Sequence, residues 1–333
     1  MGIPTVAVYS TADADTLAVE LADEAVCVGP PAARDSYLNV GNVLGAAAIT
    51  GCDAVHPGYG FLSENPTFAT ECARNGITFV GPAPEVMARM GDKVEAKRAA
   101  REAGLPVLEG SDGPVATLAE AREAAERAGF PILLKAAAGG GGRGMRRVEG
   151  AGELDTAFDV AAREAQAAFS DGSLYVERLL EGARHVEVQI LADGLGGVLV
   201  CGDRECSIQR RHQKLVEEGP APHLPAATRE RMHDAAMRAA LAWGYRSADT
   251  YCRPGGAIPP HYDSLLAKLC VWAPDRPRAV ARLQRALAET VVTGVPTTLP
   301  LLADIAREPA FGAGRYTTAY LTEHAAALPT LAG

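Results

Sequence analysis

The feature that most constrains the fold of this chain is a run of four glycines between two segments of strand character. Gly139 to Gly142 follow the apolar stretch 131–135, which ends in Lys135, and they precede the stretch 145–148. Glycines allow successive backbone N–H groups to converge on an anion, and a lysine on the preceding strand reaches the same anion. The pattern predicts a hairpin whose tip binds phosphate. A flexible linker without a ligand is the alternative. The lysine precedes the glycines, so the run is not a Walker P-loop.

Strand and helix patterns alternate along the whole chain, which predicts an α/β fold. Thr117 and Glu120 have the spacing of a capping box, and Gly129 follows that helix as a stop. The first layer is expected to contain strands at 5–9, 54–56 and 77–80, with helices at 16–22 and 65–74. Later helices are expected at 84–104, 117–129, 225–243, 275–290 and 298–307. Buried positions of a further helix are predicted at Leu154, Phe158, Ala161, Ala165 and Phe169.

Two stretches in the middle of the chain have strand alternation. Between 184 and 190, apolar side chains alternate with His185, Glu187 and Gln189, which predicts a half-buried antiparallel strand with one polar face. In the second stretch, every side chain from Gln209 to Lys214 can donate a hydrogen bond. As a single strand, this stretch would present one face with Gln209, Arg211 and Gln213 and another with Arg210, His212 and Lys214. A cationic face of this kind suits a carboxylate-like or phosphate anion. A solvated strand balanced by Glu217 and Glu218 is equally well supported.

A third candidate segment is the loop 56–65, of sequence HPGYGFLSEN. It follows a predicted strand and precedes a predicted helix, which is where α/β folds place ligand-facing loops. A structural turn with Asn65 at the helix N-cap is the alternative reading.

Length and composition limit the classes of function. A chain of 333 residues with 48% hydrophobic residues is long enough for two or three folded domains. The net charge of −9 argues against nucleic acid as the main partner. No apolar run reaches the roughly 18 residues of a membrane span, and no signal peptide is recognised. Seven scattered cysteines without a CxxC pair favour reduced thiols and a cytoplasmic location.

Five segments in order resemble the biotin carboxylase family. The resemblance extends over nearly the whole chain, including the tail that begins at 259–264. The matching segments are 56–65 (HPGYGFLSEN), 90–93 (MGDK), 135–146, 184–187 (RHVE) and 209–218 (QRRHQKLVEE). The resemblance implies ATP-dependent carboxylation of carrier-bound biotin with bicarbonate, through carboxyphosphate. This is the first half-reaction of acyl-CoA carboxylases, including those of fatty acid biosynthesis.

The resemblance also implies the architecture. The fold is expected to be an α/β fold with a truncated Rossmann-like N-terminal layer over residues 1–90. An ATP-grasp domain is expected over 91–248, with a mobile lid at about 107–179. A partial biotin carboxylase C-terminal domain is expected over 249–333. The chain resembles a family member that is truncated at its N-terminus and has an internal deletion after Ala248.

Site residues follow from the same resemblance. Lys93 and Lys135 would hold ATP phosphates, with Gly141 and Gly142 in the lid loop over them. The segment 177–180 would receive the adenine, largely through backbone groups, and Lys214 would contact bicarbonate. The expected ATP-binding residues are Lys93, Lys135, Gly141, Gly142, Glu177, Arg178, Leu179, Leu180, His185, Gln209 and His212.

Cofactors and partners are implied as well. The cofactors would be ATP and Mg²⁺, with biotin as a substrate attached to another chain, because no Met-Lys-Met site occurs here. The resemblance implies a biotin carboxyl carrier protein, a carboxyltransferase and a homodimer as partners, and neither nucleic acid nor a membrane.

The resemblance breaks down after Ala248. The family continues into a Gly-Thr-x-Glu strand and a Glu-Met-Asn-x-Arg-x-Gln-Val-Glu strand, which supply the metal ligands, the catalytic arginine and the general base. Neither motif occurs in this sequence, so no catalytic and no metal-binding residue is predicted. Three hypotheses remain: a biotin carboxylase by descent, a non-catalytic nucleotide-binding or scaffold module, and a fragment of a longer enzyme.

Overall fold

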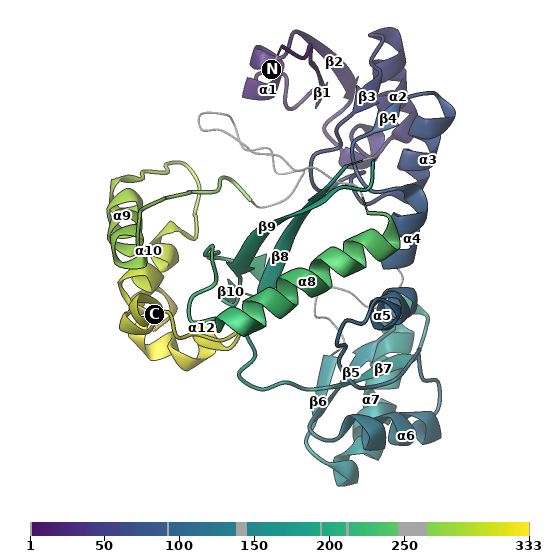
Figure 1. Cartoon of the computed structure of the whole chain (residues 1–333), viewed down its shortest axis with the longest axis vertical. Coiled ribbons are helices and arrows are strands. Elements are labelled where there is room, and N and C mark those ends of the chain that lie inside the picture. Colours follow the sequence, from purple (N-terminus) through teal and green to yellow (C-terminus); the bar gives the residue numbers. More distant parts are fainter. Residues whose placement is uncertain are drawn as a thin grey trace. The chain divides into compact units, whose positions relative to one another are not determined.

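The structure is a computed structural model that describes residues 2–91, 93–137, 145–193, 195–210, 213–245 and 265–332 (Figure 1). The chain divides into two units, which are described separately. The first unit contains Met1–Ala96, Ile190–Leu199 and Met237–Cys270, and the second contains Lys97–Gln189, Val200–Ala236 and Val271–Gly333. None of the described helices is long and apolar enough to cross a membrane.

The N-terminal part of the first unit alternates strands and helices, as the sequence predicts. Its elements are β1 (Val6–Ser10), α1 (Leu17–Leu21), β2 (Glu24–Gly29), a 3-10 turn (Ala33–Asp35), α2 (Val40–Ile49), β3 (Ala54–Val55), α3 (Pro66–Arg74), β4 (Thr78–Phe79) and α4 (Pro84–Gly91). β1 pairs with β2 and β3 pairs with β4, both in parallel. The sequence prediction missed β2 and α2. Where the sequence predicts one helix over 84–104, the described residues contain α4 and α5 (Lys93–Glu102), and residue 92 between them is outside the described ranges.

A small apolar core holds this layer together. It consists of Val43, Ala47, Leu62, Phe68, Cys72 and Ile77. Asn65 caps α3 by accepting a hydrogen bond from the Phe68 N–H at 3.0 Å. Phe61 has a φ of 42° and stacks on Tyr37 at 5.0 Å between ring centroids. The loop 56–65 therefore has the structural role of a helix-initiating turn, and its ligand-facing role stays a prediction.

In the second unit, β5 (Ile132–Ala136) lies between β6 (Met145–Val148) and β7 (Leu174–Arg178) in an antiparallel sheet. Helices α6 (Leu118–Ala128) and α7 (Ala151–Phe169) pack against this sheet and against each other (Figure 1). The predicted capping box is present, since Thr117 accepts from the Glu120 N–H while Glu120 accepts from the Thr117 N–H. The core includes Leu134, Val148, Leu154, Phe158, Ala161, Ala165, Leu174 and Val176. The predicted hairpin of strands 131–135 and 145–148 is confirmed.

The middle of the chain supplies β8 (Val186–Ala192), β9 (Val198–Glu205), β10 (Gln209–Arg210), β11 (Gln213–Lys214) and α8 (Ala226–Trp243). β8 and β9 form a two-stranded sheet. The single strand expected over 209–214 is wrong, because β10 and β11 are antiparallel partners with Gln209 opposite Lys214. Directly opposed residues of an antiparallel pair share a face, so Gln209 and Lys214 point the same way, against the prediction. The chain reversal between them interrupts the alternation that the prediction assumed.

The C-terminal part is helical. It contains α9 (Arg276–Glu289), α10 (Leu299–Arg307), α11 (Pro309–Ala313), α12 (Tyr320–Glu323), a 3-10 turn (Ala325–Ala327) and α13 (Pro329–Ala332). Its buried cluster contains Ile208, Leu301, Ile305, Phe311, Tyr316, Tyr320 and Leu328, with Leu215 and Val216 packed against it. Ile208, Leu215 and Val216 flank the β10–β11 hairpin, so the C-terminal helices support the strands that carry Gln209 and Lys214.

Candidate functional site

A cluster of charged side chains converges on Glu187, which lies on β8. Lys214 Nζ is 2.5 Å from Glu187 Oε1, and His185 Nε2 is 3.1 Å from the same oxygen. Arg204 on β9 reaches the other oxygen, with Nη2 at 3.1 Å from Oε2. Three cationic or potentially cationic groups therefore surround one carboxylate. We call Glu187, Lys214, Arg204, His185 and Glu217 the anion cluster.

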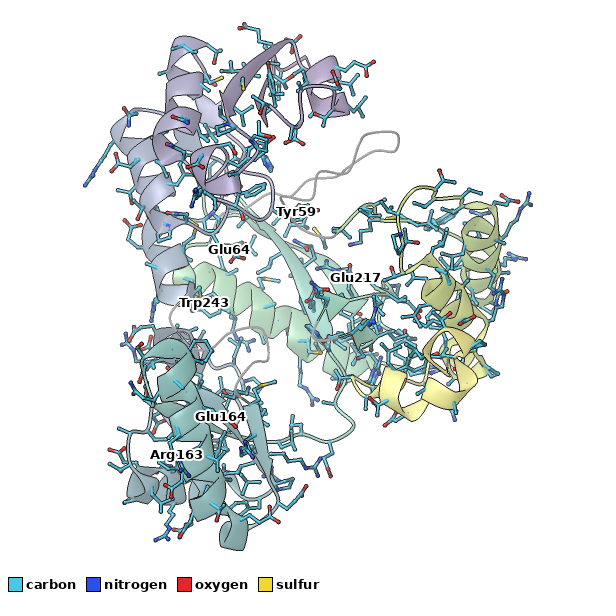
Figure 2. All side chains as sticks on the ribbon, turned by 180° about the vertical axis from the view of Figure 1, so that it is seen from behind. Tyr59, Glu64, Arg163, Glu164, Glu217 and Trp243 are labelled. Atoms are coloured by element: carbon cyan, nitrogen blue, oxygen red, sulfur yellow. The ribbon has the colours of Figure 1, made fainter. Side chains whose placement is uncertain are left out.

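Glu217 is the second carboxylate of the anion cluster (Figure 2). Its oxygens lie 3.7 Å from Arg204 Nε and 4.0 Å from Lys214 Nζ. With two carboxylates, one lysine and one arginine, the formal charge is zero when His185 is neutral. An incoming anion therefore gains a free cation only if one carboxylate releases Lys214 or Arg204.

The protonation of Glu187 follows from its surroundings. Burial by itself raises the pKa of this carboxyl, but a hydrogen bond and charge from Lys214 and a hydrogen bond from Arg204 outweigh it and hold the pKa below the ordinary value. Glu187 is therefore an anion at neutral pH. The Lys214 side chain is 35% exposed, so solvent and small ligands can reach it.

Gln209 fixes the orientation of His185. The Gln209 Nε2 atom is 2.6 Å from His185 Nδ1 and donates to the Cys206 carbonyl at 2.8 Å. An amide donor on Nδ1 requires an unprotonated Nδ1, which leaves the ring proton on Nε2, facing Glu187. The structure thus brings three predicted site residues together, Gln209, His185 and Lys214.

A buried carboxylate anchors the strands under the anion cluster. Glu205 is fully buried and accepts from Arg184 Nε at 2.7 Å and from the Ser207 N–H at 3.1 Å. The Ser207 hydroxyl in turn accepts from the His185 N–H at 2.8 Å. Because a buried charge without its partner is costly, this network holds His185 against the end of β9.

A second cluster contains Lys135, Glu177 and Lys97, in the sheet β6-β5-β7 and the preceding helix. Lys135 Nζ forms a short ion pair with Glu177 Oε2, and Lys97 Nζ is 3.4 Å from Glu177 Oε1. Lys135 and Tyr175 are register partners, which places Lys135 two residues from Glu177 across the strands. Burial raises the pKa of Glu177, but the two lysines outweigh it and lower the pKa below its ordinary value. In this state Lys135 is paired with Glu177, and its side chain is 35% exposed, as that of Lys214 is.

The other predicted site residues are placed as follows. Arg178 ends β7, the Leu179 N–H donates to the Pro131 carbonyl at 2.9 Å, and Leu180 is exposed. Lys93 begins α5, but its side chain is outside the described part of the structure. The predictions for Gly141, Gly142 and His212 also concern residues outside the described ranges.

Sequence reasoning assigned no role to Lys97, Arg204, Glu187 or Glu217 in binding. The sequence does contain a signal for Glu187, because Glu187 lies with His185 on the polar face of the predicted strand. Arg204 carries no local signal, since only the pairing of β8 with β9 brings it to Glu187. Lys97 was seen only as a charge on a helix rich in alanine.

Magnesium, which the resemblance implies, does not fit these carboxylates. Mg²⁺ requires oxygen ligands in near-octahedral geometry, and protonated lysine or arginine beside the carboxylate repels the metal. Glu177, Glu187 and Glu217 each face at least one cationic side chain. Within the described ranges, no group of three His, Cys, Asp or Glu side chains could hold a metal ion. The sequence also lacks any Glu-x-Asn tripeptide.

Three family models match successive parts of the chain. Residues 1–87 match the biotin carboxylase N-terminal domain, and residues 92–251 match the ATP-binding domain of the carbamoyl-phosphate synthase L chain. Residues 238–323 match the biotin carboxylase C-terminal domain. The biotin carboxylase of Nostoc sp. is 39% identical, over 97% of this chain and 94% of the relative. The chain belongs to the biotin carboxylase family.

Other family members are similar in sequence and structure. Biotin carboxylase 1 of Bacillus subtilis is 36% identical, over 96% of this chain and 93% of the relative. The Campylobacter jejuni biotin carboxylase in complex with β-γ-ATP has a TM-score of 0.87 at 35% identity, and 97% of this chain and 94% of that chain are covered. A Hydrogenobacter thermophilus 2-oxoglutarate carboxylase domain dimer, with MgADP, ADP and bicarbonate, has a TM-score of 0.85 at 35% identity, with 98% and 93% covered.

The alignment with the Nostoc relative is longer than this chain. The Nostoc alignment has 420 positions, whereas 97% of this 333-residue chain is about 323 residues, so about 97 positions (420 minus 323) have no counterpart here. The matches to the ATP-binding and C-terminal domains also overlap at 238–251. A gap immediately after Ala248 stays a prediction, because residues 246–264 are outside the described ranges.

Proposed function

We propose that this chain binds ATP and bicarbonate as biotin carboxylases do, within the ATP-dependent carboxylation of biotin. In that reaction bicarbonate accepts the γ-phosphoryl group of ATP, which gives ADP and carboxyphosphate. The carboxyl group then passes to a biotin nitrogen and phosphate leaves. The observation that supports the proposal is the anion cluster of this family member, in which Lys214 and His185 meet at Glu187 while Gln209 contacts His185.

The proposed roles follow the resemblance. Lys93, Lys135, Gly141 and Gly142 bind the phosphates, and the segment 177–180 receives the adenine. His185, Gln209 and His212 lie near the ribose and phosphates, and Lys214 binds bicarbonate. For Lys135, phosphate oxygens compete with Glu177, and Lys97 stays as a counter-charge for Glu177 when Lys135 leaves.

The same proposal includes domains and partners. We assign residues 1–90 to the N-terminal domain, 91–248 to the ATP-grasp domain with a lid at 107–179, and 249–333 to the C-terminal domain. A biotin carboxyl carrier protein and a carboxyltransferase are the proposed partners, because the sequence has no Met-Lys-Met site. A homodimer in a compartment that holds ATP, such as the cytoplasm, completes the proposal.

Biotin carboxylation itself is not expected of the chain alone. Phosphoryl transfer depends on a metal that neutralises the phosphate oxygens, and the carboxylates of the anion cluster do not suit one. Loss of grouped catalytic residues commonly lowers rates by several orders of magnitude. The chain therefore supplies binding of the nucleotide and of the anion, while the reaction requires groups absent from this sequence.

Two measurements on the purified chain test the proposal. The first is the rise in melting temperature with ATP, which follows from ligand binding to the folded state, with Lys135→Ala as the matched variant. The second is the transfer of label from radioactive bicarbonate to free biotin. ATP stabilisation that is lost in Lys135→Ala, with no labelled biotin, is expected. No stabilisation by ATP, or biotin carboxylation by the chain alone, would each contradict the proposal.

A scaffold that pairs with carboxylase subunits is the second candidate function. The Hydrogenobacter thermophilus relative is described as a domain dimer, and that observation favours it. Analytical ultracentrifugation, with and without a purified biotin carboxylase, distinguishes the two. A scaffold would form a mixed complex irrespective of ATP, while the proposed binding function requires stabilisation by ATP.

A further inference from the structure

The Glu218 carboxylate is the meeting point of three donors from the C-terminal helical part. Arg276 donates from Nε to Oε2 at 2.8 Å and from Nη2 to Oε1 at 2.8 Å. The Tyr316 hydroxyl donates a short hydrogen bond to Oε1. Arg276 and Glu218 are 58 residues apart in the sequence, and Tyr316 is 98 residues from Glu218. A bidentate arginine–carboxylate contact of this kind fixes both the position and the plane of the carboxylate.

Arg276 is itself held in place on its other side. Its Nη1 and Nη2 atoms donate to the backbone carbonyls of Gly312 and Phe311, each at 2.6 Å. The guanidinium carbon lies 5.3 Å from the centroid of the Phe311 ring. The guanidinium therefore joins α9, the end of α11 and Glu218 into one rigid group. We call Arg276, Tyr316 and Glu218 the Glu218 clamp.

Arg276 and Tyr316 both keep their donor protons in the clamp. Hydrogen bonding to Glu218 raises the pKa of Arg276 further above its usual range. Burial and the charge of Glu218 raise the pKa of the Tyr316 phenol, so the hydroxyl stays protonated and stays a donor at neutral pH.

The backbone of Glu218 connects the clamp to the anion cluster. The Glu205 N–H donates to the Glu218 carbonyl at 2.8 Å, and the Glu218 N–H donates to the Glu205 carbonyl at 3.0 Å. Neighbouring side chains of an extended segment point in opposite directions. Glu218 faces Arg276, while Glu217 faces Arg204 and Lys214 on the other side.

Apolar packing supports the same connection. Leu215 and Val216, which lie between Lys214 and Glu217, pack against the buried cluster that contains Phe311 and Tyr316. The segment 214–218 is thus held in two ways, by the packing of Leu215 and Val216 and by the contacts of the Glu218 carboxylate. Neither contact reaches a ligand directly, which makes the clamp a means of placing Lys214 and Glu217.

We propose that Arg276 and Tyr316 are positioning residues for the anion cluster, because they hold Glu218 and thereby set where Lys214 and Glu217 lie. This rests on the proposed function, in which Lys214 binds bicarbonate. Releasing Glu218 lets the segment 214–218 shift, so Lys214 loses its place opposite Gln209. The expected consequence is weaker bicarbonate binding, with the nucleotide contacts of Lys135 unaffected.

The test measures the Kd for bicarbonate of the full chain, from the line width of labelled bicarbonate in ¹³C NMR spectra, well below the melting temperature. The variants are Tyr316→Phe, Arg276→Gln and Arg276→Lys. Arg285→Gln is the matched control, because Arg285 lies on the same helix and contacts only the exposed Glu289 in the described structure. ATP affinity and melting temperature are recorded for every variant.

The positioning role predicts that Tyr316→Phe and Arg276→Gln weaken bicarbonate binding about 5- to 10-fold, within the range of mutations that act through another residue. ATP affinity should change less than about 2-fold, and Arg276→Lys should recover part of the loss. A lower melting temperature with an unchanged bicarbonate Kd would show a structural clamp only and would overturn the inference. If wild-type chain does not bind bicarbonate and Lys214→Ala changes nothing, the proposed function itself fails, and the inference with it.

Discussion

Lys214 Nζ lies 2.5 Å from Glu187 Oε1, so the lysine proposed to bind bicarbonate is already paired with a carboxylate of its own protein. Glu187 keeps a second cationic partner in Arg204, at 3.1 Å. Glu187 can therefore release Lys214 without becoming an unpaired buried charge. Anion binding at this cluster is an exchange of one carboxylate for another anion on Lys214, and its strength depends on Glu187.

The first prediction concerns this competition. Glu187→Gln removes the charge that competes for Lys214, so bicarbonate should bind about 3- to 10-fold more tightly, as expected for losing one nearby like charge in a partly exposed site. Lys214→Ala should abolish measurable binding. Titration by ¹³C NMR measures both, and Glu289→Gln on the exposed face of α9 is the control for charge alone. Weaker binding in Glu187→Gln would refute the competition.

The second prediction concerns the nucleotide. Lys135→Ala removes a charged donor for phosphate and should weaken ATP binding about 10-fold or more, because hydrogen bonds to charged groups contribute about 1.5–3 kcal/mol. Isothermal titration calorimetry measures the Kd. Arg163→Ala, on the neighbouring helix α7 (Figure 2), is the control and should leave the Kd unchanged. Equal losses in both variants would mean a general electrostatic effect and not a contact of Lys135.

Much of the local structure could be predicted because its causes are local. The Thr117 capping box, the Asn65 cap and the hairpin before Met145 depend on residues within a few positions of each other, and the structure confirms them. The burial of Leu154 and Phe158 followed from helical spacing alone. Local rules therefore predicted most of the helices and strands, although they missed β2 and α2.

The site could be predicted only in part, because its contacts are set by chain reversals and by distant segments. The turn between Gln209 and Lys214 reversed the predicted facing of the two residues, and local alternation carries no sign of it. Arg204 reaches Glu187 only through the pairing of β8 with β9. Tyr316 is 98 residues from Glu218, and no pattern near either residue indicates their contact.

The third prediction concerns acid stability. Burial raises the pKa of Asp203, but hydrogen bonds from Arg229 and the Ala221 N–H, with His233 at 3.1 Å, lower it below the ordinary value of 3.8. A carboxyl with a lowered folded-state pKa stabilises the fold above its unfolded pKa, and this stabilisation is lost as pH falls from about 4 through the folded-state pKa.

Asp203→Asn should therefore make the free energy of unfolding depend less on pH below about pH 4. At neutral pH it should lower the free energy of unfolding by about 1–3 kcal/mol, since Arg229 loses a buried partner. Urea unfolding from pH 3 to 7 measures both effects. Asp234→Asn, at an exposed position on helix α8, which also carries Arg229, is the control. If the free energy of unfolding falls with pH in the same way in wild type and in Asp203→Asn, groups other than Asp203 cause the loss of stability in acid.

The fourth prediction concerns the apolar core of the sheet β6-β5-β7. Leu134 is fully buried in the central strand β5, so Leu134→Ala should cost about 2–5 kcal/mol, the sum of lost transfer free energy and a cavity. Hydrogen exchange of the amides of β5 and β7 measures the loss locally. The control Leu195→Ala alters a side chain that is 96% exposed and should change stability by less than about 0.5 kcal/mol. Similar exchange in both variants would contradict the packing described for this sheet.

The central claim is that this chain binds a triphosphate through cationic side chains, and that the described carboxylates beside them are not suited to hold a metal against it. Isothermal titration of ATP into the full chain, once with Mg²⁺ and once with EDTA, tests it most directly. Mg²⁺ neutralises part of the charge that Lys135 and its neighbours attract, so the Kd with EDTA should be equal to or lower than the Kd with Mg²⁺. A Kd at least about 10-fold lower with Mg²⁺ would show a metal site in this chain and contradict the account.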